Sequence, residues 1–163
     1  MSLTQSDLFA LDKGGELLDA MKESNPNRRH IMACIGDNYP IDQLDDAGNN
    51  VLSVAAFRGF APETAALLKR GAWVGHADKN GCTPLICAAL MGHLDVVKLL
   101  VAAKADVHAV DAQNRTAAYG AMKNGFTDVT AFLIESGAVP PPVDLDVELK
   151  TAVAVSRPLR LKR

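Results

Sequence analysis

Two cysteines and a histidine lie close together in the sequence and are the first candidates for chemistry: Cys82, Cys87 and His93. Thiolate and imidazole groups bind zinc, but the arrangement C-x4-C-x5-H lacks the paired close spacing of a zinc site. We therefore expect structural roles for these residues, with Cys87 on a helix and His93 at the corner that follows it.

No other motif indicates catalysis. The sequence has no phosphate-cradling glycine loop, G-x-S-x-G elbow or H-E-x-x-H pair. An acidic group at Asp42, Asp45 and Asp46 suits a solvated edge that faces a basic partner better than a weak cation site. A hydrolase built from scattered cysteine and histidine would need a deep pocket with two titratable groups in contact. We therefore predict no catalytic residue, no metal and no cofactor, and a protein that is not an enzyme.

The composition favours one helical domain in the cytoplasm. Hydrophobic residues make up 48% of the 163 residues, but only 5% are aromatic and 25 are alanine. This mix suits helices that pack closely through small side chains. The chain lacks the run of about 18 apolar residues that a membrane span needs and the apolar core of a signal peptide. Its odd number of cysteines favours a reducing compartment, with a nuclear or host-cell location left open.

Identical residues recur at a fixed interval along the chain. Gly59, Gly92 and Gly125 lie 33 residues apart. The same interval separates five aspartates, which are Asp12, Asp45, Asp78, Asp111 and Asp144. Such a recurrence indicates an internal repeat. Stacking the chain at this period gives four rows, 12–44, 45–77, 78–110 and 111–143.

The third row predicts a turn and two short antiparallel helices. Asn80-Gly81 is a tight-turn signal, because both residues tolerate positive φ. Thr83 offers an N-cap and Pro84 suits the first helical position. Gly92 then ends the helix in the left-handed conformation. The packed faces are expected to be Leu85, Ala88 and Ala89 on the first helix, and Val97, Leu99 and Leu100 on the second.

The pattern D-x-x-G-x-T-P-L-x-x-A-A-x-x-G-H, followed by V-x-x-L-L, resembles the ankyrin repeat over about residues 12–157. The resemblance implies an all-α repeat fold, an α-solenoid in which each repeat is a β-hairpin finger plus two antiparallel helices. The second row replaces Thr-Pro by Asn50-Val51, Asn114 stands where glycine is usual, and Lys104 replaces a helix-ending glycine. These departures predict softer seams between the repeats.

The two ends of the array are less regular. Helices are expected at about 4–12, 15–24 and 27–36. The 33-residue register pairs the second with the third, and the alternative pairs the first with the second. We divide the single domain into an N-terminal cap segment (1–11), the four repeats, a capping half-repeat (144–157) and a basic tail (158–163). Residues 144–157 also alternate with period two, which is typical of a strand.

The resemblance places variable contact residues on the finger turns and just before each corner glycine. The resulting protein-binding candidates are Asp46, Ala47, Asn49, Phe57 and Arg58 in the second unit; Lys79, Asn80, Cys82, Leu90 and Met91 in the third; Ala112, Gln113, Arg115, Lys123 and Asn124 in the fourth; and Trp73, at a normally polar hairpin position.

Three of these candidates form an expected apolar cluster. Phe57, Leu90 and Met91 should be neighbours, since equivalent positions on adjacent units stack. Either a partner's apolar side chain docks there, or the three pack against neighbouring turns. If the first alternative holds, Leu90→Glu with Met91→Lys abolishes binding and leaves the melting temperature almost unchanged.

The expected function is protein recognition through a rigid concave surface. The alternative is a targeting or inhibitory regulator that acts on a separate enzyme through the same surface. We expect a monomer with an unidentified protein partner and no nucleic acid, because the body of the chain is acidic. The last seven residues, RPLRLKR, carry four basic groups. They either dock on a polyanion or simply solubilise the end of the stack.

Overall fold

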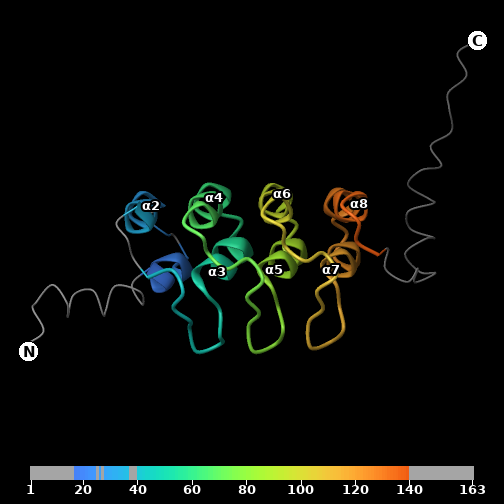
Figure 1. The fold of residues 1–163 in the computed structure, drawn as a ribbon, viewed down its shortest axis with the longest axis horizontal. Coiled ribbons are helices and arrows are strands. Elements are labelled where there is room, and N and C mark those ends of the chain that lie inside the picture. Colours follow the sequence, from blue (N-terminus) through green and yellow to red (C-terminus); the bar gives the residue numbers. More distant parts are fainter. Residues whose placement is uncertain (1–16, 25, 27, 37–39, 140–163) are drawn as a thin grey trace, which may run out of the picture.

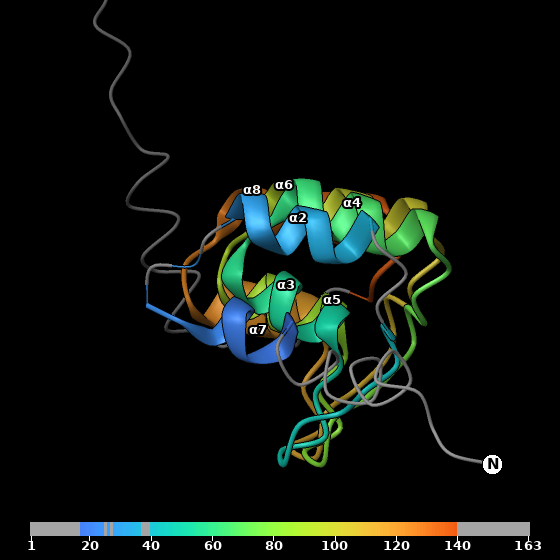
Figure 2. The same ribbon diagram turned by 90° about the vertical axis from the view of Figure 1, so that its left-hand side faces the viewer.

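The structure is a computed structural model that describes residues 17–24, 26, 28–36 and 40–139. Its helices form two parallel layers, and extended fingers project from one of them (Figures 1 and 2). The inner layer holds residues 17–22, α3 (Val51–Arg58), α5 (Pro84–Leu90) and α7 (Ala117–Lys123). The outer layer holds α2 (Arg28–Gly36), α4 (Ala61–Lys69), α6 (Leu94–Ala102) and α8 (Thr127–Glu135). The all-α repeat fold is confirmed.

Each labelled inner helix begins at a side-chain cap. The side chains of Thr83 and Thr116 accept hydrogen bonds from the backbone N–H groups of Ile86 and Tyr119 at 3.3 and 3.2 Å. Asn50 caps α3 in the same way, accepting from the N–H of Ser53 at 2.8 Å. The replacement of Thr-Pro by Asn50-Val51 therefore keeps the cap, because asparagine is as good an N-cap as threonine.

The corner glycines lie where the repeat predicts them. Gly59, Gly92 and Gly125 have φ angles of 72°, 75° and 82°, in the left-handed region. Gly92 is further constrained by its neighbour, since a Cβ there would lie 2.5 Å from the ring of Phe126. The two predicted stand-ins for glycine, Lys104 and Asn114, also have positive φ, at 67° and 58°.

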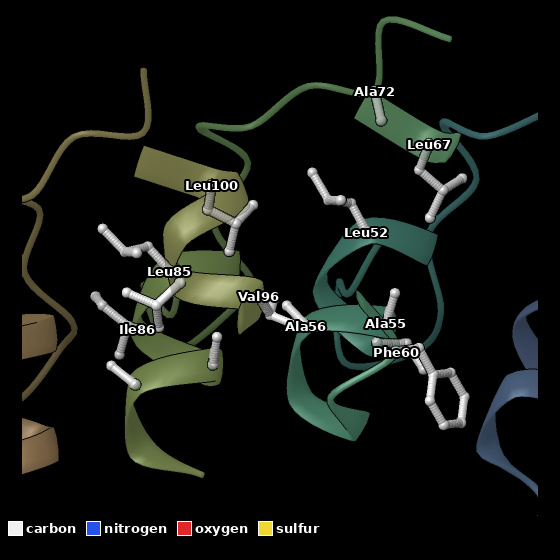
Figure 3. Packing of buried hydrophobic residues seen from close by; sticks show 14 of the residues in the cluster. Leu52, Ala55, Ala56, Phe60, Leu67, Ala72, Leu85, Ile86, Val96 and Leu100 are labelled. Atoms are coloured by element: carbon white, nitrogen blue, oxygen red, sulfur yellow. The ribbon is translucent and has the colours of Figure 1, made fainter. Parts of the chain in front are cut away.

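Small side chains bring the inner helices together. Ala55, Ala56, Ala88 and Ala89 are completely buried, and the absence of longer side chains allows close approach of the backbones. Larger residues fill the space between the layers, as Figure 3 shows for Leu52, Leu67, Leu85 and Leu100. On α6 the buried residues are Val96, Val97 and Leu100. The expectation that Leu99 points inward is wrong, because the rotation of the helix buries Val96 and leaves Leu99 only partly covered.

The recurring aspartates organise the fingers. The carboxylate of Asp78 accepts from the N–H groups of Asn80 and Cys82 at 2.8 and 2.7 Å. Asp45 and Asp111 make the equivalent bonds in their own fingers. A short acceptor that bonds two backbone donors holds a turn closed, which explains why this residue type repeats at the period of the array.

Neighbouring fingers are joined through their backbones. The N–H of Lys79 donates to the carbonyl of Ala47 at 3.1 Å, and the N–H of Ala112 donates to that of Asn80 at 2.8 Å. The two bonds connect equivalent positions of consecutive units. The fingers therefore form a continuous wall beside the inner helices.

Side chains also connect each unit with the one before it. The guanidinium of Arg58 donates to the carbonyl of Glu23 at 2.5 Å, and the amide of Asn124 donates to that of Leu90 at 2.8 Å. At the middle seam, the ring Nε2 of His93 lies 3.1 Å from the carbonyl of Phe57. Each unit thus supplies a partner for the exposed carbonyls at the end of the preceding inner helix.

The first seam contains an ion pair in which the carboxylate is buried and the guanidinium is half exposed. Arg28 on α2 donates to both carboxylate oxygens of Glu63 on α4, at 2.8 and 2.6 Å. Glu63 is only 1% exposed, and its burial alone would raise the pKa of the carboxyl. The hydrogen bonds from Arg28 outweigh that effect and hold the pKa of Glu63 below its usual value. The guanidinium of Arg28 also lies 5.0 Å from the centre of the Phe60 ring.

The N-terminal helix at 17–22 lies in the inner layer beneath α2 (Figure 1). This is the pairing of the second expected helix with the third. The expected helix at 4–12, the cap segment, the capping half-repeat, its alternative strand and the basic tail lie outside the described residues. The division of the chain into these segments stays a prediction.

Candidate binding groove

A cavity of about 480 Å³ lies between the inner helices α3 and α5 and the fingers beside them. It is lined by Lys22, Ala47, Asn49, Ser53, Val54, Phe57, Arg58, Asp78, Asn80, Cys82, Cys87 and Leu90. We call this set the groove cavity. Seven of the predicted site residues meet in it: Ala47, Asn49, Phe57, Arg58, Asn80, Cys82 and Leu90.

The wall of the groove cavity is largely apolar, and its most accessible ring is that of Phe57. This side chain is 49% exposed although it lies on a helix whose first six residues are buried. Val54 comes three residues before Phe57, and Cys87 comes three residues before Leu90. Residues at this spacing share one helix face, so the helical period was the signal that could have added Val54 and Cys87 to the prediction.

Leu90 lines the groove cavity and also packs against the next unit. A Cβ added to Gly120 on α7 would lie 2.8 Å from a Leu90 methyl group. This side chain thus has a packing partner on a helix, not on a neighbouring turn, and its role in binding stays a prediction. Met91 is 39% exposed and does not line the groove cavity. The double substitution at these two positions would consequently disturb packing as well as binding.

Several other predicted residues use their polar groups within the array. The ammonium of Lys79 donates to the carbonyl of Asp46 at 2.6 Å. Arg115 pairs with Asp111 at 2.6 Å and donates to the side chain of Gln113 at 2.9 Å. The ammonium of Lys123 lies 5.8 Å from the centre of the Tyr119 ring. Their assignment to a partner surface stays a prediction.

Trp73 is 65% exposed and lies outside the groove cavity, in the loop after α4. Its ring meets that of His76 edge-on, with the ring centres 5.7 Å apart. His76 Nε2 in turn lies 2.6 Å from the carbonyl of Gly48. Trp73 therefore extends a contact between consecutive fingers and does not belong to the groove cavity.

The two thiols of the groove cavity lie against each other. Cys82 precedes the N-cap Thr83, and Cys87 is the fourth residue of α5, so the two occupy the positions of a hydrophobic staple. The hydrogen bond between the thiols lowers the pKa of Cys82 and, with burial, raises the pKa of Cys87. Cys87 stays protonated, which suits the structural role expected of it. Within the described residues, no three histidine, cysteine or acidic side chains form a metal-binding group.

Comparison with known families accounts for this architecture. A family model described as "Ankyrin repeats (3 copies)" matches residues 17–111 and 52–144, which together cover most of the chain. The chain belongs to the ankyrin-repeat family. The corner glycines, the side-chain caps of the inner helices and the fingers described above are thus the elements of ankyrin repeats.

Three curated relatives share part of the sequence. Human "Ankyrin repeat and KH domain-containing protein 1" is 37% identical over 98 residues, which is 59% of this chain and 4% of the human protein. The Caenorhabditis elegans protein mask-1 is 39% identical over 71 residues (44% of this chain and 3% of its own length). The Drosophila melanogaster protein mask is 39% identical over 67 residues (41% and 2%). The chain therefore spans only a few per cent of the relatives' length.

Ankyrin repeats are generally non-catalytic protein-interaction modules. All three relatives are named as proteins that contain ankyrin repeats and a KH domain. In the part of the chain that the structure describes, no helix is long and apolar enough to cross a membrane.

Proposed function

We propose that this ankyrin-repeat chain is a non-catalytic recognition module that binds a protein partner in its groove cavity. The observation that carries the proposal is the half-exposed ring of Phe57, which lies beside Val54 and Leu90 in a cavity walled by two fingers. An accessible apolar side chain in a preformed hollow is typical of an interaction hot spot.

The structure of the fingers supports this proposal. Backbone hydrogen bonds join successive fingers, and aspartate side chains close their turns. The groove is therefore built before a partner arrives, and association costs little ordering of the chain. We further propose that the chain acts as a monomer in the cytoplasm.

Substitution of Phe57 tests the proposal. Phe57→Ser removes the exposed ring without opening the core, so we expect partner capture from a cell extract to fall at least about tenfold while the melting temperature changes little. Ile134→Ser is the matched control, because Ile134 is also an exposed apolar residue (40%) but lies on the outer helix α8. Quantitative mass spectrometry of the captured proteins provides the readout.

If both substitutions reduced partner capture equally, or if neither reduced it, a role for the groove cavity would be contradicted. The same experiment bears on the alternative, in which the chain regulates a separate enzyme. If the captured partner is an enzyme, its activity measured with and without this chain distinguishes simple binding from targeting or inhibition.

A further inference from the structure

A second hollow, of about 350 Å³, adjoins the groove cavity and shares Lys22 and Ala47 with it. Its remaining lining residues are Leu18, Asp19, Gln43, Leu44, Asp45 and Asp46. We call it the acidic hollow, because it holds three carboxylates and one ammonium group. A partner segment that leaves the groove cavity past Ala47 therefore enters a surface of different chemistry.

The cations around these two hollows already have partners within the chain. The ammonium of Lys22 lies 2.5 Å from the carboxylate of Asp45. The guanidinium of Arg58 donates to the carbonyls of Lys22 and Glu23, and the ammonium of Lys79 donates to that of Asp46. An acidic partner would have to compete with these contacts.

Fewer of the carboxylates in the acidic hollow have partners within the described part of the chain. Asp45 is engaged, since burial opposes its ionisation but the bonds from Lys22 and Asn49 outweigh that effect and lower the pKa of Asp45 to about 2. Among the described residues, neither Asp19 nor Asp46 forms an ion pair, and their side chains accept no hydrogen bond there. Both are exposed. The charges left available to a partner in the acidic hollow are therefore negative.

We propose that the groove binds an extended segment of a partner protein in which an apolar side chain is flanked by arginine or lysine. The apolar side chain enters the groove cavity beside Phe57, and the basic side chain lies over Asp19 and Asp46. This inference rests on the proposed function and adds the chemistry of the partner to it. It also argues against an acidic segment or a nucleic acid, because either would bring negative charge to the same two carboxylates.

The experiment is a selection of short random peptides displayed on phage against the immobilised full chain. We expect enrichment of peptides that carry leucine, isoleucine, methionine or phenylalanine next to arginine or lysine. The enriched peptide is then synthesised, and its Kd is measured by fluorescence anisotropy at low and high salt. Asp19→Asn with Asp46→Asn should weaken binding by about tenfold at low salt and flatten the salt dependence.

Two control variants separate charge from packing. Asp95→Asn removes one carboxylate from the outer helix α6, away from both hollows, and should leave Kd unchanged. Phe57→Ser should weaken binding equally at low and high salt, because it removes an apolar contact. This pattern of effects supports both the groove and the basic character of its partner.

Other outcomes are distinguishable. Enrichment of acidic or uncharged peptides whose binding still depends on Phe57 would overturn the basic partner and leave the proposed function standing. Peptides whose binding is insensitive to Phe57→Ser would overturn the proposed function as well. If a chain lacking residues 157–163 bound the selected peptide at least about tenfold tighter, the chain's own Leu-Arg-rich tail would compete with the peptide for the groove, and the tail would replace a partner segment as the occupant of the free chain.

Discussion

The first and third seams of the array perform the same task with different chemistry. Between the first and second units, the contacts are charged, and Arg28–Glu63 and Lys22–Asp45 bridge the seam. Between the third and fourth units, the ring of Phe126 covers Gly92, and one amide, Asn124, reaches back to the carbonyl of Leu90. The repeat geometry is thus compatible with either polar or apolar contacts between units. The apolar seam should respond to changes in packing, and the charged seam to the removal of charge.

The largest expected effect is at the apolar seam. Gly92→Ala forces alanine into the left-handed region, at about 1–2 kcal/mol, and pushes its Cβ against the Phe126 ring, at about 1–3 kcal/mol more. We expect a total loss of about 2–5 kcal/mol in the free energy of unfolding, measured by urea titration.

Gly125→Ala is the matched control for that substitution. Gly125 has a similar φ of 82°, but no described atom lies within 4 Å of an added Cβ. The control should therefore lose only the cost of placing alanine in the left-handed region, about 1–2 kcal/mol of the free energy of unfolding. A loss as large as that of Gly92→Ala would show that residues beyond 139 pack on this corner, as the capping half-repeat predicts.

At the charged seam, the key substitution is Arg28→Met. It leaves the carboxylate of Glu63 buried without its partner. Because Arg28 itself is half exposed, we expect a loss of about 2 kcal/mol, less than the roughly 3–5 kcal/mol for breaking a fully buried pair. The double variant Arg28→Met with Glu63→Met should recover most of that loss in the same urea titration. A double variant no more stable than the single one would show that the charge on Glu63 is not the cause.

Acid should loosen the charged seam first. The folded-state pKa values of Asp45 and Glu63 both lie below the ordinary values, and that of Asp45 is about 2. Such groups stabilise the fold above their unfolded pKa, near 4, and this contribution is lost as the pH falls through the folded pKa. Between pH of about 4 and 2, amide hydrogen exchange should therefore lose protection in α2 and α4 before α6 and α8. Simultaneous loss in all four helices would contradict this order.

The smallest effect concerns one buried hydroxyl on α4. Thr64 is completely buried, and its Oγ1 has no hydrogen-bond partner among the described residues. Thr64→Val keeps the shape and removes the unsatisfied group, so we expect a gain of up to about 1 kcal/mol. Ser53→Ala is the contrasting variant, because the Ser53 hydroxyl donates to Asn50 at 2.9 Å. It should lose about 1 kcal/mol, and thermal unfolding followed by circular dichroism resolves the two signs.

The sequence was informative where one residue fixes local backbone geometry. The glycine corners, the Thr83 cap and the closed turns at the aspartates depend on contacts within a few residues, so their spacing could be interpreted directly. The family resemblance placed Phe57, Asn80 and Leu90 in a common groove. The structure brings these three to one cavity.

Contacts between units were harder to predict. Nothing near Arg28 or Glu63 in the sequence marks them as partners, because their meeting depends on how α2 and α4 stack. Lys22 was missed in the groove for the same reason, since it comes from the unit before the fingers that it faces. The burial of Val96 instead of Leu99 depended on the rotation of a nine-residue helix, which its apolar pattern leaves open.

The bonds between Lys79 and Ala47, and between Ala112 and Asn80, involve main-chain atoms alone. Their formation requires no particular side chain at the tips. The tip residues other than the positive-φ positions Gly48, Gly81 and Asn114 can therefore be exchanged while the spacing between the fingers is preserved. A library that varies only these tip positions would redirect the molecule to new targets at little cost in folding.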